Sequence, residues 1–326
     1  LDANGNRASS KDATGTETIN RFDEANRLMD AQSSDGASSL SWRPNVLLES
    51  ITHSNGVHSA YQYDHARRLA SIVHSKNSVA TLTLQYEYDN NGNRLAETRT
   101  ESAIPGQAAG TRRTVYAYDF DDRLIEASIT HSPVDANNPN TRTAWTLDGV
   151  GNRLSETITR LDTNVVLSSK TYTYNARDQL TGVVDATNQL DVRYQYDGHG
   201  NRTKRELWRG TPLVQINATN YTFDSRDRLI KAEPEAPNTA DAPTLEFIYD
   251  ADDHKIARIE TPWLSGVPQT AQAKITYELR DGMDLLHEAI PGNAASTTPN
   301  AQGLRLTDSY RRGAKLDRHI RFDESG

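Results

Sequence analysis

The residues of this sequence that could do chemistry are chiefly carboxylates in short polar runs. Residues 89–93 read Asp-Asn-Asn-Gly-Asn, and carboxylate and amide oxygens of this kind are calcium ligands. An EF-hand loop needs glycine at its sixth position and glutamate at its twelfth, whereas glycine is fourth here. We therefore interpret this run as a tight turn. Loose calcium binding by clustered turn aspartates is the alternative.

The nine histidines do not indicate a metal site or a catalytic site. None forms a His-Glu-x-x-His pair, and the closest spacing, His53 and His58, falls in an expected hairpin loop. The sequence has no Gly-x-Ser-x-Gly elbow and no phosphate-cradling glycine loop. Its 44 carboxylates are numerous enough to form chance pairs, so no glycosidase dyad can be assigned. We expect no catalytic, cofactor-binding or metal-binding residue, and a protein that is not an enzyme.

The aspartates belong to a repeated motif. Its long form has an aromatic residue or Leu, then Asp, two variable residues and Gly-Asn-Arg, and it starts at Leu1, Tyr88, Leu147 and Tyr196. A one-residue-shorter form alternates with it and starts at Phe22, Tyr63, Tyr118, Tyr174 and Phe223. The Asp-equivalent positions are 21, 41, 25, 30, 29, 27, 22, 27 and 26 residues apart. A degraded copy at 42–47 divides the long gap, another starts at Tyr249, and Tyr277-Glu278 continues the spacing.

Each copy predicts a β-hairpin with a tight turn. Asp can accept hydrogen bonds from backbone N–H groups two residues on, while the later Gly takes positive φ. Two aromatic residues usually precede the turn, two apart, so both rings leave the same face of a strand. We expect these rings to pack against one another across strands, with binding of glycans or surfaces as the alternative. The structural repeat positions are Asp2, Gly5, Asp23, Tyr63, Asp64, Tyr88, Asp89, Gly92, Arg94, Tyr118, Asp119, Asp148, Gly151, Arg153, Tyr174, Tyr196, Asp197, Gly200, Phe223, Asp224, Tyr249 and Asp250.

Composition limits the kind of core that these hairpins can form. Only 35% of the 326 residues are hydrophobic, and the mean hydropathy is −0.74, so a thick packed core is hard to supply. Regular Tyr, Trp and Phe residues favour folded β-structure over disorder. About eleven units predict roughly two dozen strands and a strip on the order of 110 Å wide, which must coil or close. Such an array leaves open strand edges that need partners.

Charge and residue usage exclude several classes of protein. The net charge of −8 is modest and spread along the chain, which disfavours nucleic-acid binding. There is no cysteine, so disulfides and thiolate metal sites are excluded. No apolar run approaches 18 residues, so we expect no membrane insertion by this segment. The chain starts inside a motif copy, and we expect it to be part of a longer protein.

The alternating motif resembles the YD-repeat (Rhs) family, which includes bacterial Rhs toxins, the B and C components of Tc toxins, and teneurins. The resemblance covers about residues 1–290 as a strip of about eleven units. Residues 291–326 resemble the stretch just upstream of the Rhs core domain. The family implies an all-β hairpin array, wound into a spiralling, hollow shell (cocoon) or forming a segment of one. In toxin members a self-cleaving site and the effector follow the repeats, so no catalytic residue carries over to this chain.

The first functional hypothesis is a non-enzymatic shell segment of a secreted Rhs/Tc-type toxin. It would be exported from a bacterium as part of a larger protein, either secreted or on the cell surface. Its expected partners are flanking repeats or a core domain of the parent chain, an enclosed C-terminal effector, and further copies through edge-to-edge association. The alternative is a cell-surface or glycan-binding adhesion module. Neither hypothesis requires a cofactor.

Overall fold

The computed structural model describes residues 1–11, 15–103, 108–134, 137–235, 241–281, 284–291, 304–312 and 319–321. Most of these residues are in β-strands, and no α-helix occurs among them. The predicted all-β class is therefore confirmed. No helix in this part of the chain has the length and apolarity needed to cross a bilayer. The chain divides into two units, Leu1–Ser169 and Lys170–Gly326.

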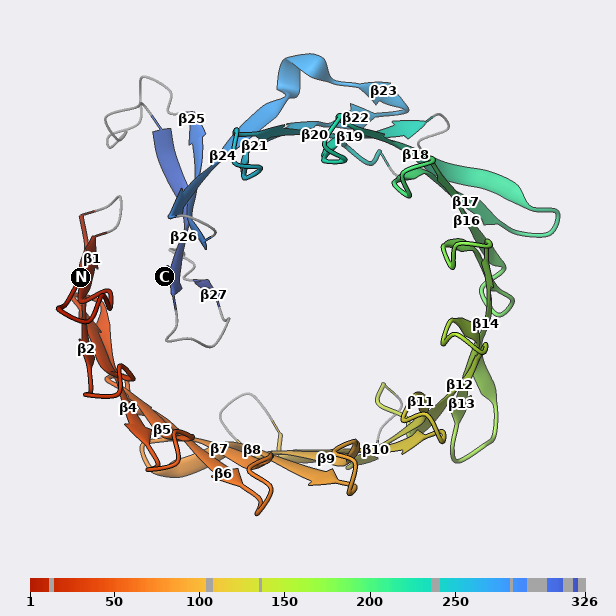
Figure 1. Cartoon of the computed structure of the whole chain (residues 1–326). Coiled ribbons are helices and arrows are strands. Elements are labelled where there is room, and N and C mark those ends of the chain that lie inside the picture. The colour runs from red at the N-terminus through yellow and green to blue at the C-terminus, as the bar shows by residue number, and fades with distance from the viewer. Residues whose placement is uncertain are drawn as a thin grey trace. The chain divides into compact units, whose positions relative to one another are not determined.

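The first unit is a strip of antiparallel strands. Each strand pairs with the next one along the chain, so consecutive hairpins lie side by side (Figure 1). Neighbouring hairpins supply almost all of its contacts, which is the organisation expected of a repeat array. The strands are β1 (Ser9–Lys11), β2 (Glu17–Phe22), β3 (Leu28–Ser33), β4 (Gly36–Trp42), β5 (Leu48–His53), β6 (Val57–Tyr63), β7 (Leu69–Lys76), β8 (Val79–Tyr88), β9 (Arg94–Glu101), β10 (Gly110–Tyr118), β11 (Leu124–Ser132), β12 (Thr141–Leu147) and β13 (Arg153–Arg160).

The second unit repeats this arrangement, with a small added hairpin and one 3₁₀ turn. The added hairpin, β22–β23, forms a separate two-stranded sheet. The elements are β14 (Val166–Tyr174), which begins before the division, β15 (Leu180–Asp185), β16 (Leu190–Tyr196), β17 (Arg202–Arg209), β18 (Val214–Phe223), β19 (Leu229–Glu235), β20 (Thr244–Tyr249), β21 (Lys255–Thr261), β22 (Trp263–Leu264), β23 (Val267–Pro268), η1 (Thr270–Gln272), β24 (Lys274–Asp281), β25 (Asp284–Pro291), β26 (Leu304–Arg312) and β27 (His319–Arg321).

The expected boundary at residue 290 does not interrupt the sheet. β25 runs to Pro291, and β26 pairs with it antiparallel, with Ile290 opposite Arg305. The strip therefore continues into the segment that the sequence sets apart. The resemblance of residues 291–326 to the stretch upstream of a core domain stays a prediction.

The expected copy at Tyr277-Glu278 is not a turn. Both residues lie inside β24, and the strand continues to Asp281 before β25 returns from Asp284. Glu278 is instead a buried side chain whose carboxylate lies 2.6 Å from the Lys255 ammonium. The aromatic–acidic pair is therefore part of the sheet.

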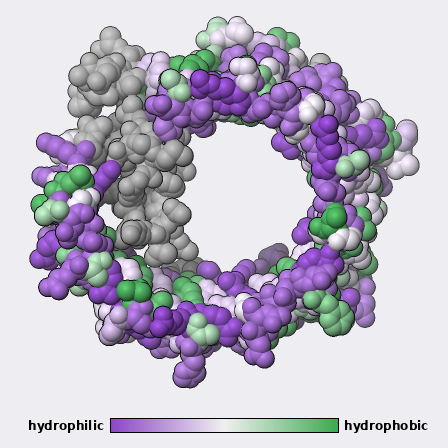
Figure 2. All heavy atoms as spheres, in the orientation of Figure 1, coloured by the Kyte–Doolittle hydropathy of each residue, from purple (hydrophilic) through white to green (hydrophobic). Residues whose placement is uncertain are grey.

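The core is thin, as the composition predicts. Among the described residues the buried hydrophobic side chains are small apart from one leucine: Leu40, Ala96, Ala127, Ala218, Ala257 and Ala289. No large side chain in the described part of the chain is fully buried. Figure 2 shows hydrophilic residues over most of the visible surface, with hydrophobic ones scattered among them. The strip is consequently held by strand pairing and polar bridges more than by burial of apolar area.

The aromatic pairs alternate with exposed residues along their strands. Tyr86 and Tyr88 are half-buried on either side of exposed Glu87, and Tyr194 and Tyr196 flank exposed Gln195 in the same way. This alternation places both rings of a pair on one face, as strand geometry requires. The face with the rings is therefore the more protected face of the strip next to each turn.

Candidate functional site

The repeat motif folds into one recurring turn, which is the most regular polar arrangement in the chain. In the copy at Asp64, the Asp64 N–H donates to the Arg68 carbonyl at 2.9 Å, and the Arg67 N–H donates to the Asp64 carbonyl at 3.0 Å. Eleven turns in the described part of the chain share the first bond, starting at Asp2, Asp23, Arg43, Asp64, Asp89, Asp119, Asp148, Asn175, Asp197, Asp224 and Asp250. The degraded copy at 42–47 is one of them.

The long and short forms have turns of equal length. In both, the bond joins the Asp position to the fourth residue after it, which is Asn93 in the long copy at Asp89 and Arg68 in the short copy at Asp64. The return strand also begins at the fifth residue in both, at Arg94 and at Leu69. The short form therefore does not lack a residue of the turn. It differs in residue type, because its arginine stands at the fourth position after the Asp and that of the long form at the fifth.

In the nine turns that start with aspartate, its carboxylate closes the turn. Asp119 Oδ1 accepts from the Asp121 N–H at 3.0 Å and the Arg123 N–H at 2.9 Å, the Asx arrangement that the sequence predicts. The other oxygen binds the side chain of the fourth residue. In short copies that start with aspartate this is an arginine, as in Arg123 Nε to Asp119 Oδ2 at 2.7 Å, and in long copies it is an asparagine, as in Asn93 Nδ2 to Asp89 Oδ2 at 3.0 Å.

The third residue after the Asp has positive φ in both forms. In the long copies it is glycine, with φ of 96° at Gly92 and 98° at Gly151. In the short copies it is a residue with a side chain, such as Arg67 at 63° or Asp122 at 58°. Val46 occupies this position in the degraded copy at 64°, where a β-branched residue is strained.

The arginine of a short copy joins its own turn to the next one. Arg68 donates from Nε to Asp64 Oδ2 at 2.7 Å and from Nη1 to the Asp89 carbonyl at 2.6 Å. Its guanidinium carbon also lies 4.7 Å from the centroid of the Tyr88 ring. The same bridge to the next turn's carbonyl is made by Arg27, Arg123 and Arg228. Charge, planarity and two donor directions are all used, which is why arginine suits this position.

In five copies the tyrosine before the Asp returns a bond to the preceding turn. The Tyr88 hydroxyl donates to the Leu69 carbonyl at 2.8 Å. Trp42 makes the equivalent bond with Nε1, to the Leu28 carbonyl at 2.8 Å. Four further tyrosines bond the fifth residue of the preceding turn in this way: Tyr63, Tyr118, Tyr196 and Tyr249. The Tyr-Asp pair thus connects successive turns as well as forming one.

Long copies join the next turn through asparagine. Asn93 Nδ2 donates to Asp122 Oδ1 at 2.6 Å, and Asn201 Nδ2 donates to Asp227 Oδ1 at 2.8 Å. Their arginine at the fifth position lies over the first ring of its own pair, as Arg94 does over Tyr86 at 4.7 Å. Arg153 stacks in the same way on Trp145 at 5.0 Å. We call this succession of linked turns the turn ladder.

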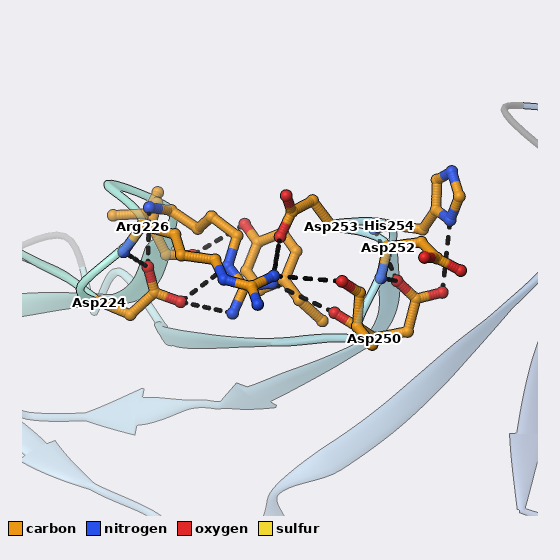
Figure 3. A network of polar contacts seen from close by, with 10 residues as sticks. Asp224, Arg226, Asp250, Asp252, Asp253 and His254 are labelled. Atoms are coloured by element: carbon orange, nitrogen blue, oxygen red, sulfur yellow. Dashed lines mark hydrogen bonds and ion pairs between the residues drawn. The ribbon is translucent and has the colours of Figure 1, made fainter.

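The turn ladder lowers the pKa of its aspartates. The side-chain bond from Arg228 lowers the pKa of Asp224 to about 2, and backbone N–H groups add to the effect. The Arg68 side chain likewise lowers the pKa of Asp64. Figure 3 shows the Asp224 turn and the Asp250 turn, with Arg226 reaching from the first toward the second. Arg226 Nη1 lies 2.9 Å from Asp253 Oδ1 there.

Among the described residues, one group of side chains has the composition of a metal site. Asp250, Asp252 and His254 place one ligand atom each within 4.8 Å of one another (Figure 3). Asp250 Oδ1, however, already accepts from the Asp252 and His254 N–H groups at 2.9 Å, as Asp119 Oδ1 does in its turn. The hydrogen bonds of the turn thus account for the positions of these three side chains. The group has residue types that can bind calcium, and its geometry adds no further support for the calcium alternative.

The two closest histidines do not converge. His53 ends β5 and His58 lies in β6, so they flank the hairpin loop in which the sequence places them. His53 Nδ1 is 2.8 Å from Ser38 Oγ, and His58 Nδ1 is 2.9 Å from Thr52 Oγ1. Each imidazole therefore bonds a hydroxyl on a neighbouring strand.

Sequence reasoning missed the arginines of the short copies. Arg27, Arg68, Arg123 and Arg228 are absent from the predicted repeat positions, although they make the bridge between turns. A signal was present, because their spacing from Asp is constant at four residues. The sequence could not show that the guanidinium reaches the following turn.

A family model of a known repeat matches part of the turn ladder. The family model for the RHS repeat matches residues 174–212, which contain the turns at Asn175 and Asp197. The resemblance to the YD-repeat (Rhs) family is confirmed. No curated protein matches this sequence.

Solved structures of Tc toxin proteins share the fold. The chain matches the Photorhabdus luminescens Tc holotoxin pore at 13% identity and a TM-score of 0.53, covering 96% of this chain and 18% of that one. It matches TcdB2-TccC3 without its hypervariable C-terminal region at 13% and 0.52, covering 96% and 19%. For TcdB2-TccC3-Cdc42 the values are 12% and 0.51, covering 94% and 19%. The chain thus spans about a fifth of the length of these structures, and the likeness concerns the fold.

Proposed function

We propose that this chain is a non-enzymatic segment of the shell of a secreted Rhs/Tc-type toxin, and that the shell encloses an effector. The observation that carries the proposal is the turn ladder, in which Arg68 and Tyr88 join consecutive turns in opposite directions. The fold likeness to Tc toxin structures over 94–96% of the chain supports it.

The turn ladder would hold a thin shell wall together. Each hairpin bonds chiefly to its neighbours, so a wall can extend by adding units without a thick core. The small buried side chains, such as Ala96 and Ala218, are consistent with a wall one sheet thick. The polar residues over the visible surface (Figure 2) would let the wall face water, as the wall of a hydrated lumen must.

The proposed partners follow from the comparison, because this chain spans about a fifth of the length of the Tc toxin structures. Flanking repeats or a core domain of a parent chain would continue the strip, and an effector would lie C-terminal to them. Pairing with such neighbours would also satisfy open strand edges, which otherwise favour association between copies. Export from a bacterium as part of that parent protein completes the proposal.

Limited proteolysis of the parent protein tests the enclosure. We expect a polypeptide C-terminal to the repeats to resist the protease while the shell is folded, and to be cut after the shell is unfolded in denaturant. A matched sample of the C-terminal polypeptide made alone should be cut at once. Equal rates of cleavage for the C-terminal polypeptide in the intact parent and alone would overturn the enclosure.

A further inference from the structure

The turn at Asp250 differs from the other aspartate turns at its fourth residue. In the eight others of the described chain, an arginine or asparagine at this position donates to the second carboxylate oxygen of the Asp at 2.6–3.1 Å. Here the fourth residue is His254, whose Nδ1 lies 3.3 Å from Asp250 Oδ2. Arginine and amide nitrogens only donate, whereas a neutral imidazole nitrogen can also bind a metal ion. We call Asp250, Asp252 and His254 the Asp-Asp-His group.

The turn at Asp119 shows what a pair of carboxylates with this spacing binds. It also has aspartate at its second residue, Asp121, as the turn at Asp250 does. Arg123 reaches both carboxylates, with Nε 2.7 Å from Asp119 Oδ2 and Nη2 3.6 Å from Asp121 Oδ2. A cation tethered to the turn thus serves the pair. The turn at Asp250 keeps the two carboxylates and has His254 in place of the tethered cation, which leaves a place for a free one.

The arginines of the preceding turn are engaged elsewhere. Arg228 Nη1 and Arg226 Nη1 lie 2.7 and 2.9 Å from the same oxygen, Asp253 Oδ1, and both also donate to backbone carbonyls. Figure 3 shows Arg226 reaching the turn from the Asp224 side, whereas the Asp-Asp-His group lies at its far side. Two carboxylates beside an imidazole therefore present two negative charges, which suits a divalent cation.

The distances in the Asp-Asp-His group fit a small metal ion. Two ligands at about 2.1 Å from one ion lie about 3.0–3.4 Å apart at octahedral to tetrahedral angles, and Asp250 Oδ2 and His254 Nδ1 are 3.3 Å apart. All three ligand atoms lie within 4.8 Å of one another, and the exposed Asp252 side chain can rotate to shorten its separations. The backbone N–H groups that bond Asp250 Oδ1 fix the orientation of its other oxygen.

The ligand types select the class of metal. Calcium takes six to eight oxygen ligands, whereas this group offers two carboxylates and one nitrogen. Imidazole nitrogen combined with carboxylate oxygen is a ligand set of zinc and of neighbouring transition metals. The His254 ring therefore favours a metal of the zinc type over calcium.

We propose that the Asp-Asp-His group binds a divalent transition-metal ion of the zinc type through Asp250 Oδ2, the Asp252 carboxylate and His254 Nδ1, with water completing the coordination. The ion takes the place that the Arg123 guanidinium has in its own turn. It joins the residue that follows β20 to the residue that precedes β21, so it fastens this hairpin at its turn. The site is independent of whether the strip encloses an effector, because it uses residues of one turn only.

Isothermal titration calorimetry of the full chain, freed of metal by a chelator and titrated with Zn²⁺ alone, tests the site. We expect one Zn²⁺ per chain with a micromolar dissociation constant, and much weaker heats with Ca²⁺. His254→Arg installs the residue of the short copies, so the metal-free variant should stay folded by circular dichroism and lose this binding step. Asp252→Asn keeps the backbone N–H bond to Asp250 and should weaken binding at least tenfold.

Two further variants separate the group from general binding by surface histidines. His199→Asn removes an exposed histidine of another turn and should leave the stoichiometry unchanged. Arg123→His gives the turn at Asp119 the same three residue types, so it should add a second Zn²⁺ per chain. Zn²⁺ should also raise the unfolding temperature of the unaltered chain and not that of His254→Arg.

Three results would overturn the proposal. One is the absence of Zn²⁺ binding to the unaltered chain, and another is equal stoichiometry and affinity in His254→Arg. The third is Ca²⁺ binding as tight as Zn²⁺ binding, because it would leave no role for the imidazole nitrogen.

Discussion

The Tyr88 hydroxyl donates to the carbonyl oxygen of Leu69 at 2.8 Å, nineteen residues earlier in the chain. The bond links the second aromatic ring of one copy to the first residue of β7, the strand that returns from the preceding turn. Tyr88→Phe removes only this bond, so we expect a loss of about 1 kcal/mol in unfolding free energy. Urea denaturation followed by circular dichroism measures it. Thr83→Ser, on the same strand, is the control, and equal stability of Tyr88→Phe and the unaltered chain would contradict the bridging role.

Arg68 bonds two turns at once, through Asp64 Oδ2 and the Asp89 carbonyl. Arg68→Lys keeps the charge but loses the planar fork, so it cannot make both bonds and cover Tyr88. We expect the thermal unfolding midpoint to fall by roughly 2–4 °C, corresponding to a loss near 1 kcal/mol in a chain of this size. A lysine variant as stable as the arginine parent would show that charge alone is needed.

The turn at Asp148 contains a matched pair of glycines. Gly151 has φ of 98°, whereas Gly149 is outside the positive-φ region, and a Cβ added to either meets no atom within 4 Å. Gly151→Val should therefore destabilise the chain by about 1–3 kcal/mol through backbone strain alone. Gly149→Val should cost much less. Chemical denaturation of both variants compares them, and similar losses would mean that positive φ is not the cause.

Val46 sits at the same turn position with φ of 64°, a strained value for a β-branched side chain. Val46→Gly should relieve this strain and raise the free energy of unfolding by on the order of 1 kcal/mol, after the entropy of glycine is subtracted. The side chain is exposed, so little packing is lost. Differential scanning calorimetry should show a higher midpoint for the glycine variant, and a lower one would refute the strain.

Acid should weaken the turn ladder. The folded pKa of Asp224 is about 2, against an ordinary value of 3.8, because Arg228 and backbone N–H groups bond its charged form. A lowered folded pKa gives stability that is present above the unfolded pKa and is lost as pH falls through the folded one. Stability should thus decline between about pH 4 and about pH 2. Asp224→Asn should reduce the slope of this decline, and an unchanged slope would exclude Asp224 as a contributor.

The turns were predictable because they depend on local chemistry. Asp89, the glycine three residues later and the preceding ring each have a residue type that suits one backbone role, and these types recur at fixed spacing. The degraded copy at 42–47 was predictable from spacing alone. Its turn forms although Arg43 replaces the aspartate, because the strands on either side already specify where the chain reverses.

The bridges between turns were not predictable in the same way. Whether Arg68 reaches the Asp89 carbonyl depends on how two hairpins pair side by side, which is a property of register and not of either motif. Strand length also depends on pairing between strands, which the motif does not show. The prediction of a repeat copy at Tyr277-Glu278 was wrong for this reason, because both residues lie inside β24.

Electron cryomicroscopy of the full-length parent protein tests the central claim most directly. We predict a closed or spiralling wall one β-sheet thick, with the turns at Asp64 and Asp89 adjacent along one rim and with density for a second polypeptide inside. A solid globular particle would contradict the account. So would a filament of strips joined edge to edge with no enclosed space.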